Sequence, residues 1–181
     1  MQFNRKRKSK LVFTGFTLVE LLIVMAILAV LASIGIVSFR SSQVRGRDAQ
    51  RKSDLKQIAS SLELFYSDYS KYPDAAGGKI QACPYNSITK SGADCLWGSG
   101  EFWDGQTLYF KVLPKDPSVS GDYFYRTLDS GQKFQLFATL ENTQDKECLD
   151  GDCANSPVSY SCGTGMVCNF AVTSPNTSAT E

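Results

Sequence analysis

The chain has 181 residues, 43% of them apolar, which gives it room for one domain. Its formal net charge is +1, from 19 basic and 18 acidic residues, and it contains no histidine. Catalysis that needs an imidazole base is therefore excluded. The sequence also has no GxSxG or P-loop spacing, so we predict neither an enzyme nor a cofactor.

The beginning of the chain separates into a basic leader, residues 1–15, and an apolar run, residues 16–39, in which Glu20 is the only charge. At a helical rise of 1.5 Å per residue this run extends about 36 Å, enough to cross a hydrocarbon core of about 30 Å. The alternative is a cleaved secretory signal, but the run is long for one and no small-residue cleavage site ends it. We therefore predict that residues 16–39 span a membrane.

The segment Gly15-Phe-Thr-Leu-Val-Glu20-Leu-Leu-Ile-Val-Met-Ala-Ile-Leu-Ala closely resembles the class III signal of type IV pilins and type II secretion pseudopilins. This resemblance implies that a prepilin peptidase cuts between Gly15 and Phe16 on the cytoplasmic side. It implies next that the new N-terminal residue, Phe16, is N-methylated. It also implies that the Glu20 carboxylate pairs with the terminal amine of an adjoining subunit and so sets the register of each incoming copy in a filament.

The physical chemistry of Glu20 agrees with a role in assembly. A charged side chain inside a membrane span costs about 3 kcal/mol or more on insertion scales, so some interaction must offset that cost. The positive end of the helix macrodipole helps, and cleavage before Phe16 would create a cationic amine. The alternative is a carboxylate that reaches water at the membrane edge and has no further role.

Residues 40–72 are more polar but keep a helical spacing of apolar side chains. Neither a proline nor a turn cluster occurs before residues 71–74, so we predict that one helix continues from the apolar run to this point. The Tyr72-Pro73 exit is similar to that of major pseudopilins and their close pilin relatives. The predicted buried stripe consists of Leu55, Ile58, Leu62, Phe65 and Tyr69, widened by Ala59 and Tyr66.

Six basic residues lie between residues 40 and 56, whereas residues 61–181 carry a net charge of −7. We interpret the basic residues as a solvated collar at the membrane exit, with binding of anionic lipid or nucleic acid as alternatives. Basic stem and acidic head could also attract one another across neighbouring copies. The six residues are Arg40, Arg45, Arg47, Arg51, Lys52 and Lys56.

All six cysteines fall in the predicted globular head, residues 73–181. Without histidine or a CxxC spacing, disulfides are favoured over a zinc site, which places the head outside the cytoplasm and the leader inside it. Basic residues flank the apolar run on both sides, so charge alone does not orient it.

Six cysteines allow 15 pairings. The local one is the most economical: Cys83 with Cys95, Cys148 with Cys153, and Cys162 with Cys168.

The head also contains strand signals. Residues 123–128 and 133–141 predict a hairpin around the turn at residues 129–132. Alternation in its second strand predicts one buried face against the helix. We predict a final strand at residues 167–173 and an irregular loop at residues 74–106. The fold class expected is α+β: a long N-terminal helix, its first half transmembrane, packed on a small antiparallel sheet with disulfide-stapled loops, as in type IV pilins.

An acidic stretch near the end of the head allows two interpretations. A calcium site is conceivable, since some pseudopilin heads bind calcium, but the spacing is not that of an EF-hand and a solvated acidic loop is favoured. We therefore predict no metal site. The stretch contains Asp145, Glu147, Asp150 and Asp152.

These features predict a filament subunit that serves adhesion, motility or DNA uptake. A pseudopilin of a type II secretion system is the alternative within the family, and a membrane-anchored binding module that never polymerises is the alternative outside it. The expected partners are further copies of the chain, a prepilin peptidase, an assembly platform with minor pilins, and membrane lipid before assembly. The expected location is the cytoplasmic membrane, with one span, followed by a filament on the cell surface.

Overall fold

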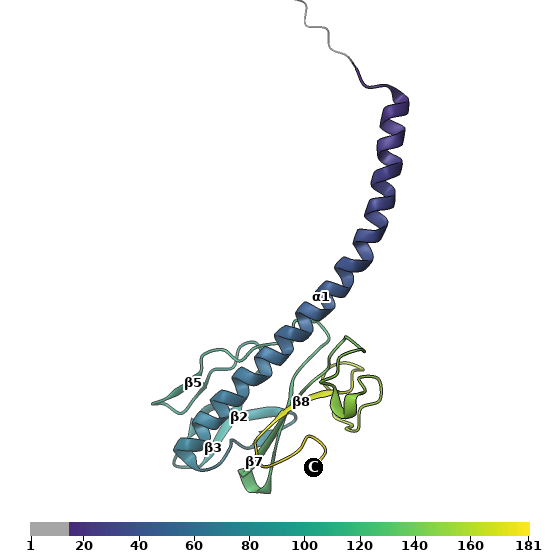
Figure 1. Cartoon of the computed structure of the whole chain (residues 1–181). Helices are drawn as coiled ribbons and strands as arrows, with labels where there is room; N and C mark the ends of the chain where they lie inside the picture. Colours follow the sequence, from purple (N-terminus) through teal and green to yellow (C-terminus); the bar gives the residue numbers. More distant parts are fainter. Residues whose placement is uncertain (1–14) are drawn as a thin grey trace, which may run out of the picture. The chain divides into compact units, whose positions relative to one another are not determined.

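Helix α1, Leu18–Tyr69, is 52 residues long and precedes all of the strands. The computed structural model describes residues 15–181, without the side chains of residues 34–38. The described chain divides into two compact units, one that ends at Ser41 and one that comprises Ser42–Glu181. Residues 42–69 of α1 therefore belong to the same unit as the strands, and Figure 1 shows them lying along the sheets. The predicted leader, residues 1–15, lies outside the described residues except for Gly15.

The strands form three antiparallel sheets in the described chain. The first has the order β1-β2-β3, the second pairs β4 with β5, and the third has the order β6-β7-β8. The bounds are Ala75–Ala76 (β1), Lys79–Asn86 (β2), Ser91–Asp94 (β3), Phe102–Trp103 (β4), Leu108–Phe110 (β5), Phe124–Leu128 (β6), Lys133–Ala138 (β7) and Phe170–Thr173 (β8). Two short 3-10 helices occur at Asp129–Gly131 (η1) and Leu149–Gly151 (η2).

The predicted hairpin is confirmed as β6 and β7, with η1 as its turn. The predicted last strand begins three residues later than expected, at Phe170, and pairs with β7. The expectation of an irregular loop at residues 74–106 was wrong, because β1, β2, β3 and β4 all lie there. These strands are short or interrupted by Pro84, and their hairpin turns supply the glycine, aspartate and asparagine that suggested a loop.

The predicted stripe on α1 is buried against the sheets, and Leu55, Ile58, Leu62 and Phe65 have no exposed surface. Tyr69 is half-buried at the end of the same stripe. Facing them are Ile80 and Ala82 of β2, Tyr125 of β6, and Phe134, Leu136 and Ala138 of β7, which form one core cluster with the helix. The α+β fold with a helix on small antiparallel sheets is thus confirmed.

The prediction of a single buried face on β7 was wrong, because Gln135 and Phe137 are also fully buried. The C-terminal segment covers the second face of the strand: Phe137 packs with Tyr160 and with the disulfide of Cys162 and Cys168. The Gln135 amide N–H donates to the carbonyl of Ser178, whereas its Oε1 has no hydrogen-bond partner among the described residues, so this polar residue is buried with only part of its hydrogen-bonding capacity used. The alternation of apolar residues predicts the face of β7 that contacts α1. It does not predict that the C-terminal segment covers the other face.

Candidate functional site

The predicted cleavage site lies just before the helix. Gly15, Phe16 and Thr17 are non-helical, and 82% of the Phe16 surface is exposed. A Cβ atom added to Gly15 would meet no described atom within 4 Å, and the backbone of Gly15 is not in the left-handed region. Among the described residues, nothing in packing or backbone conformation therefore requires a glycine at this position.

Thr17 and Glu20 form a reciprocal cap at the start of α1. The Glu20 carboxylate accepts hydrogen bonds from the Thr17 backbone N–H at 2.9 Å and from the Thr17 hydroxyl at 2.7 Å. The Glu20 backbone N–H in turn donates to the Thr17 hydroxyl oxygen at 3.3 Å. This is a capping box, which satisfies backbone donors that the first turn of a helix leaves free. We did not predict it, although the Thr-x-x-Glu spacing is its sequence signature.

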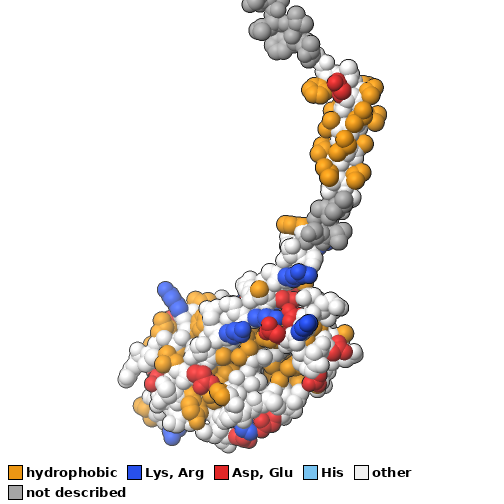
Figure 2. Space-filling view, viewed as in Figure 1, with side chains coloured by type: hydrophobic (Ala, Val, Ile, Leu, Met, Phe, Trp, Pro, Cys, Tyr) orange, Lys and Arg blue, Asp and Glu red, His pale blue; other side chains and the backbone are white. Residues whose placement is uncertain are grey.

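The first turns of α1 carry apolar side chains on all sides, as Figure 2 shows on its visible face. The large apolar residues between Phe16 and Leu31 are all exposed within the chain, from 46% at Val24 to 82% at Phe16. Exposed apolar surface of this extent requires a cover from outside the chain. Within the described part of the chain, none of the helices combines the length and the apolar composition that a membrane crossing needs.

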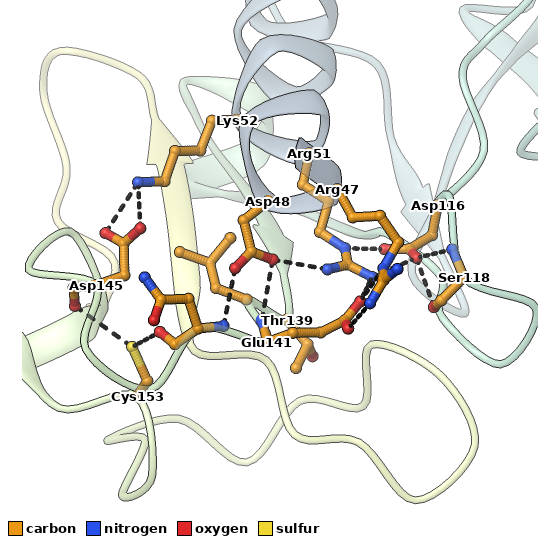
Figure 3. Close-up of polar contacts among 12 residues, drawn as sticks. Arg47, Asp48, Arg51, Lys52, Asp116, Ser118, Thr139, Glu141, Asp145 and Cys153 are labelled. Carbon is orange, nitrogen blue, oxygen red and sulfur yellow. Dashed lines mark hydrogen bonds and ion pairs between the residues drawn. The ribbon is translucent and has the colours of Figure 1, made fainter. Parts of the chain in front are cut away.

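A second polar site, the α1 ionic cluster, joins the helix to the head (Figure 3). Arg51 lies at its centre and is almost completely buried, with 1% of its surface exposed. Its guanidinium donates to Asp116 through Nε at 2.7 Å and Nη2 at 2.9 Å, and to Asp48 through Nη1 at 2.7 Å. The members of the cluster are Arg47, Asp48, Arg51, Lys52, Asp116, Glu141, Asp145 and Glu147.

Asp48 also connects α1 to the segment after β7. Its two carboxylate oxygens accept hydrogen bonds from the backbone N–H groups of Glu141, at 2.9 Å, and Asn142, at 2.8 Å. The Glu141 carboxylate binds Arg47 and lies 2.8 Å from Nη2 of Arg51. Each buried charge in this group is therefore both paired and hydrogen-bonded, which is the condition under which burial of charge is tolerated.

The contacts in the cluster shift the pKa values of several of its members. Hydrogen bonds from Arg47, and then from Arg51, outweigh the effect of burial and lower the pKa of Glu141 to about 2. Burial alone would raise the pKa of Asp116, but hydrogen bonds from Arg51 and Ser118 overcome it and lower the pKa. Burial would lower the pKa of Arg51, and its carboxylate partners raise it instead. Glu141, Asp116 and Arg51 are therefore ionised at neutral pH.

These contacts correct our interpretation of the basic residues as a solvated collar. Arg47 and Arg51 pair with carboxylates of the head, and the Lys52 ammonium lies 2.8 Å from Asp145 and 3.2 Å from Glu147. The expected attraction between basic stem and acidic head thus occurs within one chain. The spacing of Asp48, Arg51 and Lys52 could have indicated an ion pair on the helix, but not the partners 65 or more residues away. Arg40, Arg45 and Lys56 are exposed.

The six cysteines form three disulfides, Cys83–Cys95, Cys148–Cys153 and Cys162–Cys168, which is the local pairing expected from the sequence. The acidic stretch does not gather around one point. Asp145 and Glu147 bind Lys52, and the Asp152 carboxylate accepts the backbone N–H of Ala154 at 2.8 Å. Among the described residues there is no group of three or more His, Cys, Asp or Glu side chains that could hold a metal ion.

A capped N-terminal helix after a Gly-Phe junction, exposed apolar side chains along its start and a disulfide-stapled head define the class of pilin-like subunits. A sequence profile described as the prokaryotic N-terminal methylation motif matches residues 13–36. The chain belongs to the family of type IV pilins and type II secretion pseudopilins, as the resemblance in its first residues implied.

Three relatives illustrate the range of the family. The type II secretion system core protein G of Pseudomonas aeruginosa is 32% identical over 125 residues, which cover 69% of this chain and 81% of that protein. Its counterpart from Klebsiella michiganensis is 30% identical over 122 residues, 67% of this chain and 78% of that protein. The type IV major pilin protein PilA of Myxococcus xanthus is 40% identical over 62 residues, 34% of this chain and 28% of that protein. No solved structure gives a significant match.

Proposed function

We propose that the chain is a prepilin, the precursor of a structural subunit in a type IV pilus-like filament. A prepilin peptidase hydrolyses the peptide bond between Gly15 and Phe16 with one water molecule, which releases residues 1–15 and leaves a free amine on Phe16. That amine is then methylated: its nitrogen takes the methyl group of a sulfonium donor, which leaves as a thioether, and the amine loses one proton. The non-helical, exposed backbone at this junction supports the proposal, since a protease binds its substrate in an extended form. The absence of any packing reason for Gly15 among the described residues also supports recognition by an enzyme.

The observation that carries the proposal is the all-round exposure of the apolar side chains between Phe16 and Leu31. In the proposed sequence of events, residues 16–39 lie in the cytoplasmic membrane first, with the head outside. The same surface is afterwards buried against other copies in the core of the filament, because an apolar helix outside lipid must be covered. Lipid and neighbouring copies would cover the same side chains in turn, so the head can keep its fold during assembly.

Glu20 sets the register of the incoming subunit in this proposal. Its carboxylate pairs with the Phe16 amine of a neighbouring copy. In the single chain the same carboxylate is held by the Thr17 N–H and hydroxyl. Pairing with a neighbour therefore competes with the cap or adds to it through the remaining carboxylate lone pairs, since an ionised carboxylate has about four acceptor positions.

A specific observation favours a second candidate, a pseudopilus of a type II secretion system. The matches to core protein G cover about two thirds of this chain and so reach into the head, whereas the match to the Myxococcus pilin covers 34%. Under this candidate the filament would serve secretion rather than adhesion, motility or DNA uptake. The assembly platform and minor subunits would differ accordingly, but processing and packing of α1 would be the same.

Mass spectrometry and electron microscopy of sheared surface material test the proposal together. We expect fibres whose subunit has lost residues 1–15 and carries a methylated Phe16. A Gly15→Val variant should fold as well as wild type, because a side chain at this position has open space, but it should keep its leader and form no fibres. A full-length subunit found only as a membrane-anchored monomer would refute the filament and favour the anchored binding module. Deletion of secretion-system genes would distinguish the pseudopilus from a pilus.

A further inference from the structure

The head contains a groove that has no part in the proposed function. It consists of two adjoining hollows of about 430 and 450 Å³. Both are lined by Lys79 of β2, Trp97, Asp122, Gly163 and Thr164, so they form one continuous feature. Each is within the size range of small-molecule sites. The lining combines an aromatic ring, Trp97, with polar and charged side chains that can hydrogen-bond a ligand.

The floor of the groove is a close approach of two backbones that only glycine permits. Gly121 and Gly163 form an antiparallel bridge. A Cβ atom on Gly163 would lie 2.1 Å from the Ser120 carbonyl oxygen, and Gly163 has a φ of +127°. The Thr164 N–H donates to the same carbonyl at 3.0 Å. The disulfide between Cys162 and Cys168 closes the loop that carries Gly163 and Thr164.

Two segments form the walls beside this floor, and both are anchored. Trp97 follows Cys95, whose disulfide with Cys83 fixes this segment to β2. The Trp97 ring packs edge-on against Tyr123, with 5.7 Å between ring centroids, and one part of it lines the groove. The second wall follows Asp116 in the chain. The Asp116 carboxylate binds Arg51 and accepts both the N–H and the hydroxyl of Ser118. The groove is therefore preformed, and binding needs little ordering of its walls.

Positive charge predominates in the groove although the head as a whole is acidic. Lys79 and Lys115 line it together with one carboxylate, Asp122. Within the described part of the chain neither ammonium group has an ion-pair or hydrogen-bond partner, and both act on Asp122 only through longer-range attraction. Two ammonium groups are thus available to a ligand that carries a negative charge.

We propose that this groove binds an acidic saccharide of the uronic acid class, a function beyond that of a filament subunit. The open part of the Trp97 ring provides the flat apolar surface on which a sugar ring packs, and the two lysines bind the sugar carboxylate. The Asp122 carboxylate and the hydroxyls of Ser99 and Thr164 are hydrogen-bond partners for the sugar hydroxyls. On an assembled filament each head would present one such groove.

Nucleic acid is the less suitable ligand. Single strands bind along extended basic tracks with several aromatic platforms. The hollow that contains both lysines of this groove has one aromatic ring, Trp97, and the second hollow adds Tyr123 and Phe124 but no further lysine. The net charge of −7 on residues 61–181 would also repel a polyanion.

The test uses the full chain in detergent with Trp103→Phe, which leaves Trp97 as the sole tryptophan. Its fluorescence is titrated with glucuronate and with glucose, which differ only at C6. We expect saturable binding of glucuronate, with at least tenfold weaker binding of glucose. Lys79→Gln with Lys115→Gln should weaken glucuronate binding at least tenfold. The matched control Lys111→Gln, an exposed lysine outside the groove, should leave it unchanged.

Other outcomes overturn the proposal. Equal binding of glucose would remove the role of the lysines, and equal binding of acetate or inorganic phosphate would indicate a general anion site. Tighter binding of a thymidine oligonucleotide would favour nucleic acid, and no saturable signal with glucuronate would exclude the ligand class. Each of these results leaves processing and filament formation untouched, because they depend on residues 15–39.

Discussion

Arg51 of α1 and Asp116 of the segment between β5 and β6 form a two-point ion pair in which both side chains are buried. The pair joins two parts of the chain 65 residues apart, and the same Asp116 carboxylate holds Ser118 in place. Residues 42–69 of α1 are thus attached to the sheets by an apolar stripe and, nearer Ser42, by charges. The charges fix which turn of the helix faces which loop, since a shift along the axis would leave Arg51 unpaired.

Loss of Arg51 should destabilise the head strongly. Arg51→Met removes the cation that three carboxylates share and leaves Asp48 and Asp116 buried without it, so we expect the free energy of unfolding to fall by about 3–5 kcal/mol. Urea unfolding followed by tryptophan fluorescence reports on the head, because Trp97 and Trp103 both lie there. The matched control is Arg45→Met on the same helix, where the side chain is exposed and the change should be within about 0.5 kcal/mol. Equal effects of the two variants would contradict a structural role for the cluster.

Acid should weaken the same attachment. The pKa of Glu141 is lowered from 4.5 to about 2 by its hydrogen bonds to Arg47 and Arg51, and the pKa values of Asp116 and Asp145 are lowered as well. A depressed carboxyl pKa stabilises the fold above the unfolded-state pKa, and this stabilisation is lost as the pH falls from about 4.5 towards 2. Asp54, whose pKa burial raises, acts in the opposite direction and offsets part of the loss.

Unfolding measured at pH 6, 4 and 3 checks this expectation. The free energy of unfolding should fall with pH in the wild type and less steeply in Glu141→Gln, which has no carboxyl to titrate at this position. Glu101→Gln, an exposed glutamate on the head, is the matched control and should keep the wild-type slope. A Glu141→Gln variant with the full wild-type slope would show that Glu141 does not carry the effect.

The helix and the hairpin could be predicted because their signals are long and local. The stripe from Leu55 to Phe65 repeats over three turns, and the β6–β7 hairpin has a turn with Asp129 and Gly131 between two apolar strands. The ionic cluster could not be predicted, since nothing near Arg51 in the sequence indicates that Asp116 and Glu141 return to it. The burial of Gln135 depends in the same way on the C-terminal segment that covers β7.

The helix stripe provides a test with residues of the same type on two faces. Leu62 has no exposed surface and contacts the sheets, whereas Leu64 is 48% exposed on the opposite side of α1. Leu62→Ala should lower the free energy of unfolding by about 2–5 kcal/mol, because it leaves a cavity in the core. Leu64→Ala should change it by about 0.5 kcal/mol or less. A larger loss at Leu64 would mean that the two faces of the helix have been assigned the wrong way round.

Glu20 has two candidate roles, as the partner of Thr17 in the capping box and as a negative charge for a neighbouring amine. A single alanine substitution would not distinguish them. Glu20→Ala removes both the cap on Thr17 and the negative charge. Glu20→Gln keeps a side-chain oxygen at the capping position, where glutamine also fits, but has no charge to attract an amine. Thr17→Val has the complementary effect, since it removes the hydroxyl that binds Glu20 and leaves the carboxylate charged.

If the charge on Glu20 pairs with a neighbouring Phe16 amine, Glu20→Gln should be processed normally and yield at least tenfold less sheared filament than wild type. Thr17→Val should then still assemble, with faster hydrogen exchange at the Glu20 amide because the hydroxyl half of the cap, worth about 1 kcal/mol, is lost while the Thr17 backbone N–H bond to Glu20 remains. Thr17→Ser, which keeps the hydroxyl, is the control for the exchange measurement. Normal filament from Glu20→Gln together with none from Thr17→Val would reverse the assignment: the residue would act by ordering the first turn of α1, and the amine pairing would have to be abandoned.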